Sequence, residues 1–164
     1  MKKKTAYTWV IILIIFISIG YCTYRITQPS SDNTGGELIK GGHWHAKIDV
    51  LLCGEQKNLP FNLPGQSHRG LPTLHSHDDN KMHIETEGKV VNKKDITLGK
   101  FMDAVGVPFS ATQLMDKKNG DSCPGTTPGS VKMYVNGQPN TLFRDYVPNL
   151  VPDEQMDTIK IEFS

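Results

Sequence analysis

Residues 131–139 read VKMYVNGQP, and they carry the clearest indication of local structure in the chain. Apolar and polar side chains alternate as far as Val135, which predicts a strand with one buried face. The Asn136-Gly137 pair that follows is the preferred pair of a type I′ turn, so we expect the strand to turn back as a hairpin. Residues 157–163, DTIKIEF, alternate in the same way and predict the final strand of a sheet.

Upstream of this hairpin, three segments show a strand pattern. Residues 45–52 alternate well enough to predict a half-buried strand. Residues 57–63 are expected to return beside it, although two prolines in and next to this segment restrict it to a sheet edge. Residues 82–86 form a further short strand candidate.

A helix is predicted over residues 97–106. Thr97 is a suitable N-cap, the apolar side chains follow at helical spacing, and Gly106 is expected to end the helix. Residues 116–130 are rich in glycine, proline and polar side chains, which predicts a long surface loop.

The amino terminus combines a basic start with a long apolar run. Residues 1–5 include three lysines and residues 6–24 carry no charge, a length sufficient for a helix to cross a bilayer. Because basic residues stay on the cytoplasmic side, we expect a cytoplasmic tail, then a transmembrane anchor, a flexible linker and an extracytoplasmic domain. Their predicted bounds are 1–5, 6–25, 26–41 and 42–164. The alternative is a signal peptide cleaved near Gly20, which would give a secreted protein.

From Thr97 to Phe163 the order of helix, strand, Asn-Gly turn, irregular stretch and final strand resembles the ubiquitin-like β-grasp pattern. The resemblance implies a mixed sheet crossed by one helix, with the last strand parallel beside the first. The expected fold class is therefore α+β, a small mixed sheet with one crossing helix behind an N-terminal transmembrane helix. The segment ends Glu162-Phe163-Ser164 without a Gly-Gly pair, so conjugation is not implied.

Charge is distributed unevenly along the 164 residues, although the net charge is only +1. Four of the 18 basic residues lie within the first 25, which leaves 14 against all 17 acidic residues and a balance near −3 for the rest. Binding to nucleic acid requires a basic surface, so this partner is not expected.

Histidine is the most informative residue type. His43 and His45 form one H-x-H motif, and His75 and His77 form a second. On an extended chain the two rings of such a motif face the same side, so together they could supply four nitrogen ligands to zinc or copper. His83 is a fifth candidate, because its strand can pair beside the one that carries His45.

Other side chains near these histidines could support a metal. Asp78 and Asp79 could orient a ring through its second nitrogen or bind directly, and Glu85 and His68 are further candidates. All-nitrogen ligation does not suit calcium or magnesium, and copper or zinc is the ion expected outside the cytoplasm. The alternatives are solvent-exposed rings without a metal, or a pH sensor built from histidines of ordinary pKa.

A second, more general resemblance covers the histidines themselves. The pattern His43-Trp44-His45, followed by residues 74–78 and 82–85, is similar to that of uncharacterised membrane-anchored extracytoplasmic proteins. It implies that the five histidines act as one unit and implies no established activity.

Cys53 and Cys123 could form a disulfide in an oxidising compartment, or remain as two free thiols. The third cysteine, Cys22, belongs to the apolar segment.

These features lead to one preferred function and two alternatives. We expect a membrane-anchored extracytoplasmic protein that binds copper or zinc through its histidine cluster, for metal binding, delivery or sensing. The alternatives are a surface module that binds a protein partner without metal, and a small metalloenzyme with an open coordination position and Glu85 as base. No motif of a serine hydrolase, P-loop, zinc protease or dinucleotide-binding site occurs, so the sequence assigns no reaction.

Overall fold

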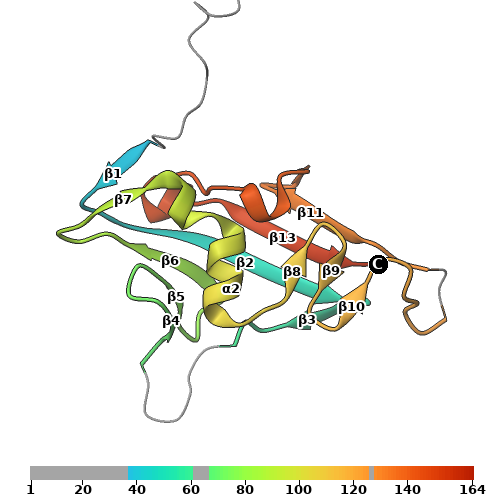
Figure 1. The fold of residues 1–164 in the computed structure, drawn as a ribbon. Helices are drawn as coiled ribbons and strands as arrows, with labels where there is room; N and C mark the ends of the chain where they lie inside the picture. Colours follow the sequence, from blue (N-terminus) through green and yellow to red (C-terminus); the bar gives the residue numbers. More distant parts are fainter. Residues whose placement is uncertain (1–36, 61–66, 126–127) are drawn as a thin grey trace, which may run out of the picture. The chain divides into compact units, whose positions relative to one another are not determined.

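The computed structural model describes residues 37–60, 67–125 and 128–164 (Figure 1). Within these ranges lie thirteen strands, one α-helix and three 3₁₀ helices, and the strands form three sheets. The described part of the chain is therefore mostly β-strand, and the expected α+β class with a single small mixed, β-grasp-like sheet was wrong. The expectation failed because many of the strands are only two or three residues long, and so short a segment shows no alternation.

The main sheet has the strand order β12–β11–β13–β2–β6–β5–β4, and β3 also pairs with β2. Strand β13 lies in its interior, parallel to β2 and antiparallel to β11. The bounds of these strands are β2 His43–Leu52, β3 Glu55–Lys57, β4 Arg69–Gly70, β5 Leu74–Ser76, β6 Lys81–Glu85, β11 Val131–Val135, β12 Gln138–Pro139 and β13 Thr158–Phe163.

Strand β2 organises this sheet because it is long enough to serve several partners. Along one edge, Lys47–Leu52 pair with β13. Along the other edge, His43–Lys47 pair with β6, and Val50–Leu52 pair with β3. The first half of β2 therefore places its histidines beside β6, while the second half belongs to the sheet interior.

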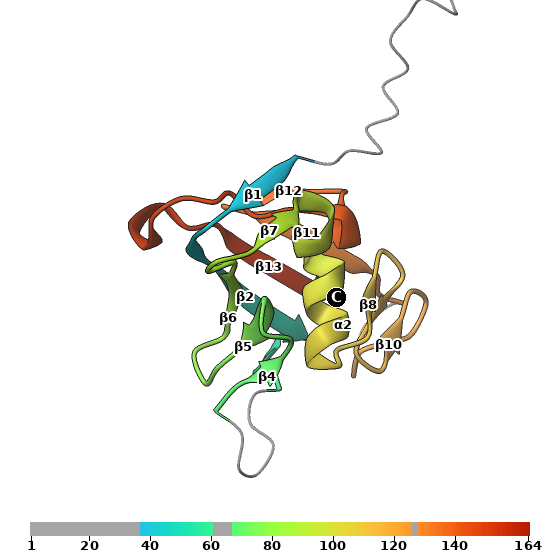
Figure 2. The same ribbon diagram turned by 60° about the vertical axis from the view of Figure 1, so that its left-hand side comes forward.

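Helix α2, Leu98–Val105, packs across one face of the main sheet (Figures 1 and 2). Its start and end confirm the sequence prediction: the Thr97 side chain accepts a hydrogen bond from the Lys100 amide, and Gly106 is left-handed with φ 77°. The buried face of the sheet presents Ala46 and Ile48 of β2 together with Met82 of β6. Because side chains alternate along a strand, the residues between these point to the opposite face.

The predicted hairpin is present at the other edge of the sheet. Asn136 and Gly137 have φ values of 51° and 78°, as a type I′ turn requires, and they connect β11 to β12. The Asn136 side chain also donates a hydrogen bond to Asp157, immediately before β13, and this bond ties the turn to the final strand.

Two small sheets and three 3₁₀ helices complete the fold. Strand β1 lies within the segment expected to be a linker, and its pairing with β7 brings that part of the chain into the folded unit. Strands β8 to β10 occupy part of the region around the predicted surface loop. The bounds are β1 Leu38–Lys40, β7 Val90–Asn92, η1 Lys93–Ile96, β8 Phe109–Ser110, β9 Gln113–Leu114, β10 Lys117–Lys118, η2 Phe143–Asp145 and η3 Asp153–Gln155.

Cys53 and Cys123 form a disulfide, with their Cα atoms 5.4 Å apart. The bridge fastens the turn after β2 to the loop that precedes β11. It lies beyond the end of β2 that is opposite to His43 and His45.

The predicted basic tail, membrane span and most of the predicted linker lie outside the described residues. In the part of the chain that the structure does describe, no helix is long and apolar enough to cross a membrane.

Candidate metal centre

The main sheet brings the two H-x-H segments to one face through the strand order β2–β6–β5. His45 of β2 lies directly opposite His83 of β6, and His83 in turn lies opposite His75 of β5. Directly opposed residues in antiparallel strands project to the same side, so the three rings share the face opposite to Ala46 and Met82. His43 and His77, two residues away along their chains, lie close to the same group.

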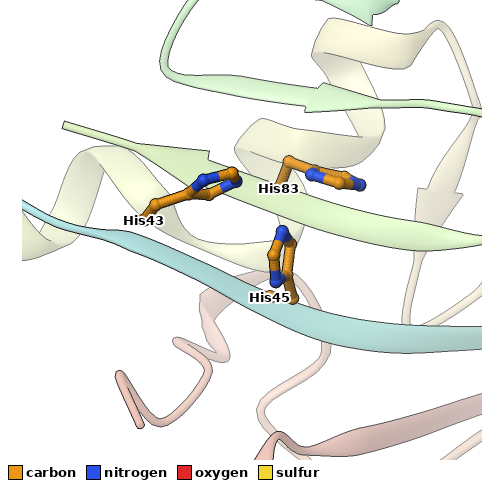
Figure 3. Close-up of side chains that lie close together, drawn as sticks. All are labelled: His43, His45 and His83. Carbon is orange, nitrogen blue, oxygen red and sulfur yellow. The ribbon is translucent and has the colours of Figure 1, made fainter. Parts of the chain in front are cut away.

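His83 is at the centre of the resulting cluster. Its ring centroid is 4.4 Å from that of His45 and 4.5 Å from that of His77. The centroids of His75 and His43 are 5.3 and 5.9 Å away. Figure 3 shows His43 and His45 projecting from β2 and His83 from β6 on the same side of the two strands.

Two groups of three histidines in this cluster could hold a metal ion. One consists of His43, His45 and His83, and the other of His75, His77 and His83. In each group, one nitrogen per ring lies within 4.8 Å of the nitrogens of the other two. The five predicted ligands are therefore brought together, but in two groups that share His83.

Oxygen atoms hold three of these rings through one nitrogen. His45 Nδ1 is 2.6 Å from an Asp153 carboxylate oxygen, and His83 Nε2 is 3.0 Å from an Asp79 carboxylate oxygen. His77 Nδ1 donates to the backbone carbonyl of Ser67 at 2.9 Å. A ring that donates one N–H in this way leaves its other nitrogen with a free electron pair, which is the usual arrangement of metal-binding histidines.

Glu85 lies between the two groups. One of its carboxylate oxygens is 3.3 Å from His43 Nε2 and 3.5 Å from His75 Nε2. Glu85 therefore places negative charge beside a ring from each group. The Nδ1 atoms of His43 and His75 are left on the other side of their rings.

The buried Nδ1 atoms of His75 and His83 are the strongest indication of a ligand. Both side chains are buried, and among the described residues neither Nδ1 atom has a hydrogen-bond partner. A buried polar atom without a partner costs about 1–3 kcal/mol, so such atoms in a native structure require an explanation. A metal ion bound by these nitrogens would supply one.

Burial also fixes the protonation state of these two rings. It lowers the pKa of His83 to about 4, against the opposing effect of Asp79. It lowers the pKa of His75 as well, and the nearby Glu85 only partly offsets this. Both rings are therefore neutral at neutral pH, as binding to a metal requires.

The predicted supporting residues take different positions. Of the two aspartates expected to orient a ring, Asp79 contacts His83, and Asp78 is exposed. His68 lies beside His75, with ring centroids 4.8 Å apart, and belongs to neither group of three.

Sequence reasoning missed Asp153, which lies in η3 and is 108 residues from the His45 ring that it contacts. No local pattern relates residues so far apart.

No protein-family model, curated protein or solved structure matches this chain.

Proposed function

We propose that this protein binds a divalent transition-metal ion, zinc or copper(II), at the histidine cluster, and captures, delivers or senses that metal. The main support is the pair of buried, unpartnered Nδ1 atoms on His75 and His83. The oxygen contacts that orient the neighbouring rings add to it. If the rings were only exposed to solvent, two of their nitrogens would not be buried without a hydrogen-bond partner.

The donor set favours zinc and copper(II) over other ions. Imidazole nitrogen suits both metals, whereas calcium and magnesium prefer oxygen ligands. Copper(I) prefers soft sulfur ligands, but the side chain of Met82 is fully buried on the opposite face of the sheet. Met133 is buried in the same core. No thioether on β6 is therefore available to the rings.

We place this function outside the cytoplasm, on a domain anchored by residues 6–25 or secreted after their removal. The Cys53–Cys123 disulfide supports this location, because disulfides persist in oxidising compartments and are rare in the cytosol. The basic residues before the apolar segment support the same orientation.

Calorimetric titration of the full chain with zinc and with copper(II) tests the proposal. We expect stoichiometric uptake of metal and its loss in His83→Ala, because His83 belongs to both groups of three. His68→Ala is the matched control, since it removes a neighbouring histidine that belongs to neither group, and it should retain binding. Absence of stoichiometric uptake by the unaltered protein would contradict the proposal and favour the module that binds a protein partner without metal.

A further inference from the structure

We infer that the cluster offers one metal ion two alternative positions that share His83, an outer position with His43 and His45 and an inner position with His75 and His77. This inference rests on the proposed function and goes beyond it, because it sets the stoichiometry and the route of the ion. It predicts a site from which a bound metal can move without leaving the protein.

The spacing of the strands separates the two positions. His83 is on β6, while the outer pair is on β2 and the inner pair is on or next to β5, to either side of β6. Neighbouring strands lie about 4.8 Å apart, so β2 and β5 are separated by roughly 10 Å. The side chains group in the same way: among the described residues, no set of three ligand atoms within 4.8 Å of one another combines His43 or His45 with His75 or His77. The ion therefore lies over β2 and β6 or over β6 and β5.

The hydrogen bonding of His83 makes the two positions mutually exclusive. Its Nε2 atom is bonded to Asp79, which leaves Nδ1 as the single nitrogen with a free electron pair. One electron pair binds one metal ion, so filling either position removes the shared ligand from the other. The cluster therefore takes one ion per chain, although it contains two groups of three nitrogens.

Burial distinguishes the two positions. His43 is exposed and its side chain retains 42% of its accessible surface, whereas His75 retains 5%. An ion arriving from solvent therefore meets the outer position first. The inner position binds the ion more tightly, because only there does the ion also satisfy the buried Nδ1 atom of His75.

Paired variants test this arrangement in the full chain. We expect the unaltered protein to bind one equivalent of zinc. His43→Ala/His45→Ala and His75→Ala/His77→Ala should each still bind one equivalent, with about tenfold weaker affinity in the variant that lacks the inner pair, a difference small enough for the outer position to hold the ion part of the time. Replacing all four residues should abolish binding. Circular dichroism of each variant checks that the sheet is retained.

A measurement on the unaltered protein keeps the test independent of any effect of the variants on folding. In spectra of ¹⁵N-histidine-labelled protein, ring signals from both the outer and the inner pair should shift during addition of the first equivalent of zinc.

Other results overturn the inference in distinguishable ways. Uptake of two equivalents would show two independent sites, and complete loss of binding in only one paired variant would show a single fixed site. Shifts confined to one group of three rings would have the same meaning. Failure of the unaltered protein to bind any metal would instead contradict the proposed function itself.

Discussion

The ring of His83 is close to four other histidines, and its two nitrogens have opposite environments. Nε2 is bonded to Asp79, whereas Nδ1 is buried without a partner among the described residues. A carboxylate bonded to Nε2 raises the basicity of Nδ1 and fixes the orientation of the ring. At the scale of single residues, the affinity of the cluster should therefore depend on Asp79 as well as on the histidines.

Replacement of Asp79 tests this dependence. Asp79→Asn removes the negative charge beside His83 and should weaken zinc binding by about 10–100-fold without abolishing it. Asp78→Asn is the matched control, because it makes the same chemical change at the exposed neighbouring position. Competition with a chelator of known affinity measures the zinc affinity of both variants. Equal effects of the two substitutions would contradict a specific role for Asp79.

A buried carboxylate outside the cluster, Asp157, has a structural role. It accepts hydrogen bonds from the Tyr146 hydroxyl, from the Asn149 amide and side chain, and from the Asn136 side chain. Burial alone would raise the pKa of Asp157, but these bonds outweigh burial and hold the pKa below its ordinary value. The ionised form is therefore favoured more strongly in the folded than in the unfolded protein.

This difference predicts how the stability of Asp157→Asn depends on pH. At neutral pH the substitution should lower the free energy of unfolding by about 1–3 kcal/mol, since it disrupts a satisfied buried network. A carboxylate whose pKa is lower in the folded protein than in the unfolded protein stabilises the folded state at pH values above the unfolded pKa. This stabilisation is lost as the pH falls through the pKa of the folded protein. The difference in free energy of unfolding between the variant and the unaltered protein, measured by urea denaturation, should therefore become smaller below about pH 4. A constant gap would show that ionisation of Asp157 does not contribute.

At the scale of elements, local signals predicted some structure and failed elsewhere for a physical reason. The Asn136-Gly137 turn and the ends of α2 depend on residues adjacent in sequence, so their patterns could be read directly. Strands β4 and β5 are too short to show an alternation of apolar and polar side chains, and they form because they pair with their neighbours in the sheet. Asp153 reaches His45 only after the chain has folded, so no sequence pattern could have placed it in the site.

The C-terminal end of α2 provides a prediction at this scale. Gly106 is left-handed, and a Cβ added there would lie 2.8 Å from an Arg69 guanidinium nitrogen. Arg69 Nε donates to the Val105 carbonyl at 2.6 Å, so a displaced guanidinium would also lose a contact with the end of the helix. Gly106→Ala should therefore cost more than the roughly 1–2 kcal/mol of left-handed strain alone.

Gly88→Ala is the control for this substitution. Gly88 has a similar φ of 69°, but a Cβ added there meets nothing within 4 Å. Thermal denaturation of both variants separates backbone strain from the contact with Arg69. If Gly106→Ala were no more destabilising than Gly88→Ala, the side chain of Arg69 would have to move away freely.

At the scale of the whole molecule, the disulfide and the histidine cluster lie near opposite ends of β2. The bridge joins residues 70 positions apart in sequence, and closing a loop of this length contributes on the order of 4 kcal/mol in the chain-entropy model. We expect Cys53→Ser/Cys123→Ser to lower the free energy of unfolding by up to this amount. Zinc affinity at a temperature where the variant remains folded should be unchanged. A parallel loss of affinity would show that the bridge also shapes the cluster.

The parallel pairing of β2 with β13 has a consequence for how the molecule assembles. The strands come from opposite ends of the described sequence, whereas the partners of β2 on its other edge, β6 and β3, follow soon after it. Contacts between distant segments form slowly, because a long loop must close first. The histidine-bearing half of the sheet can thus assemble while one edge of β2 still lacks its neighbour. A metal ion that joins β2 to β6 early would shorten the time during which that bare edge can recruit another chain and aggregate.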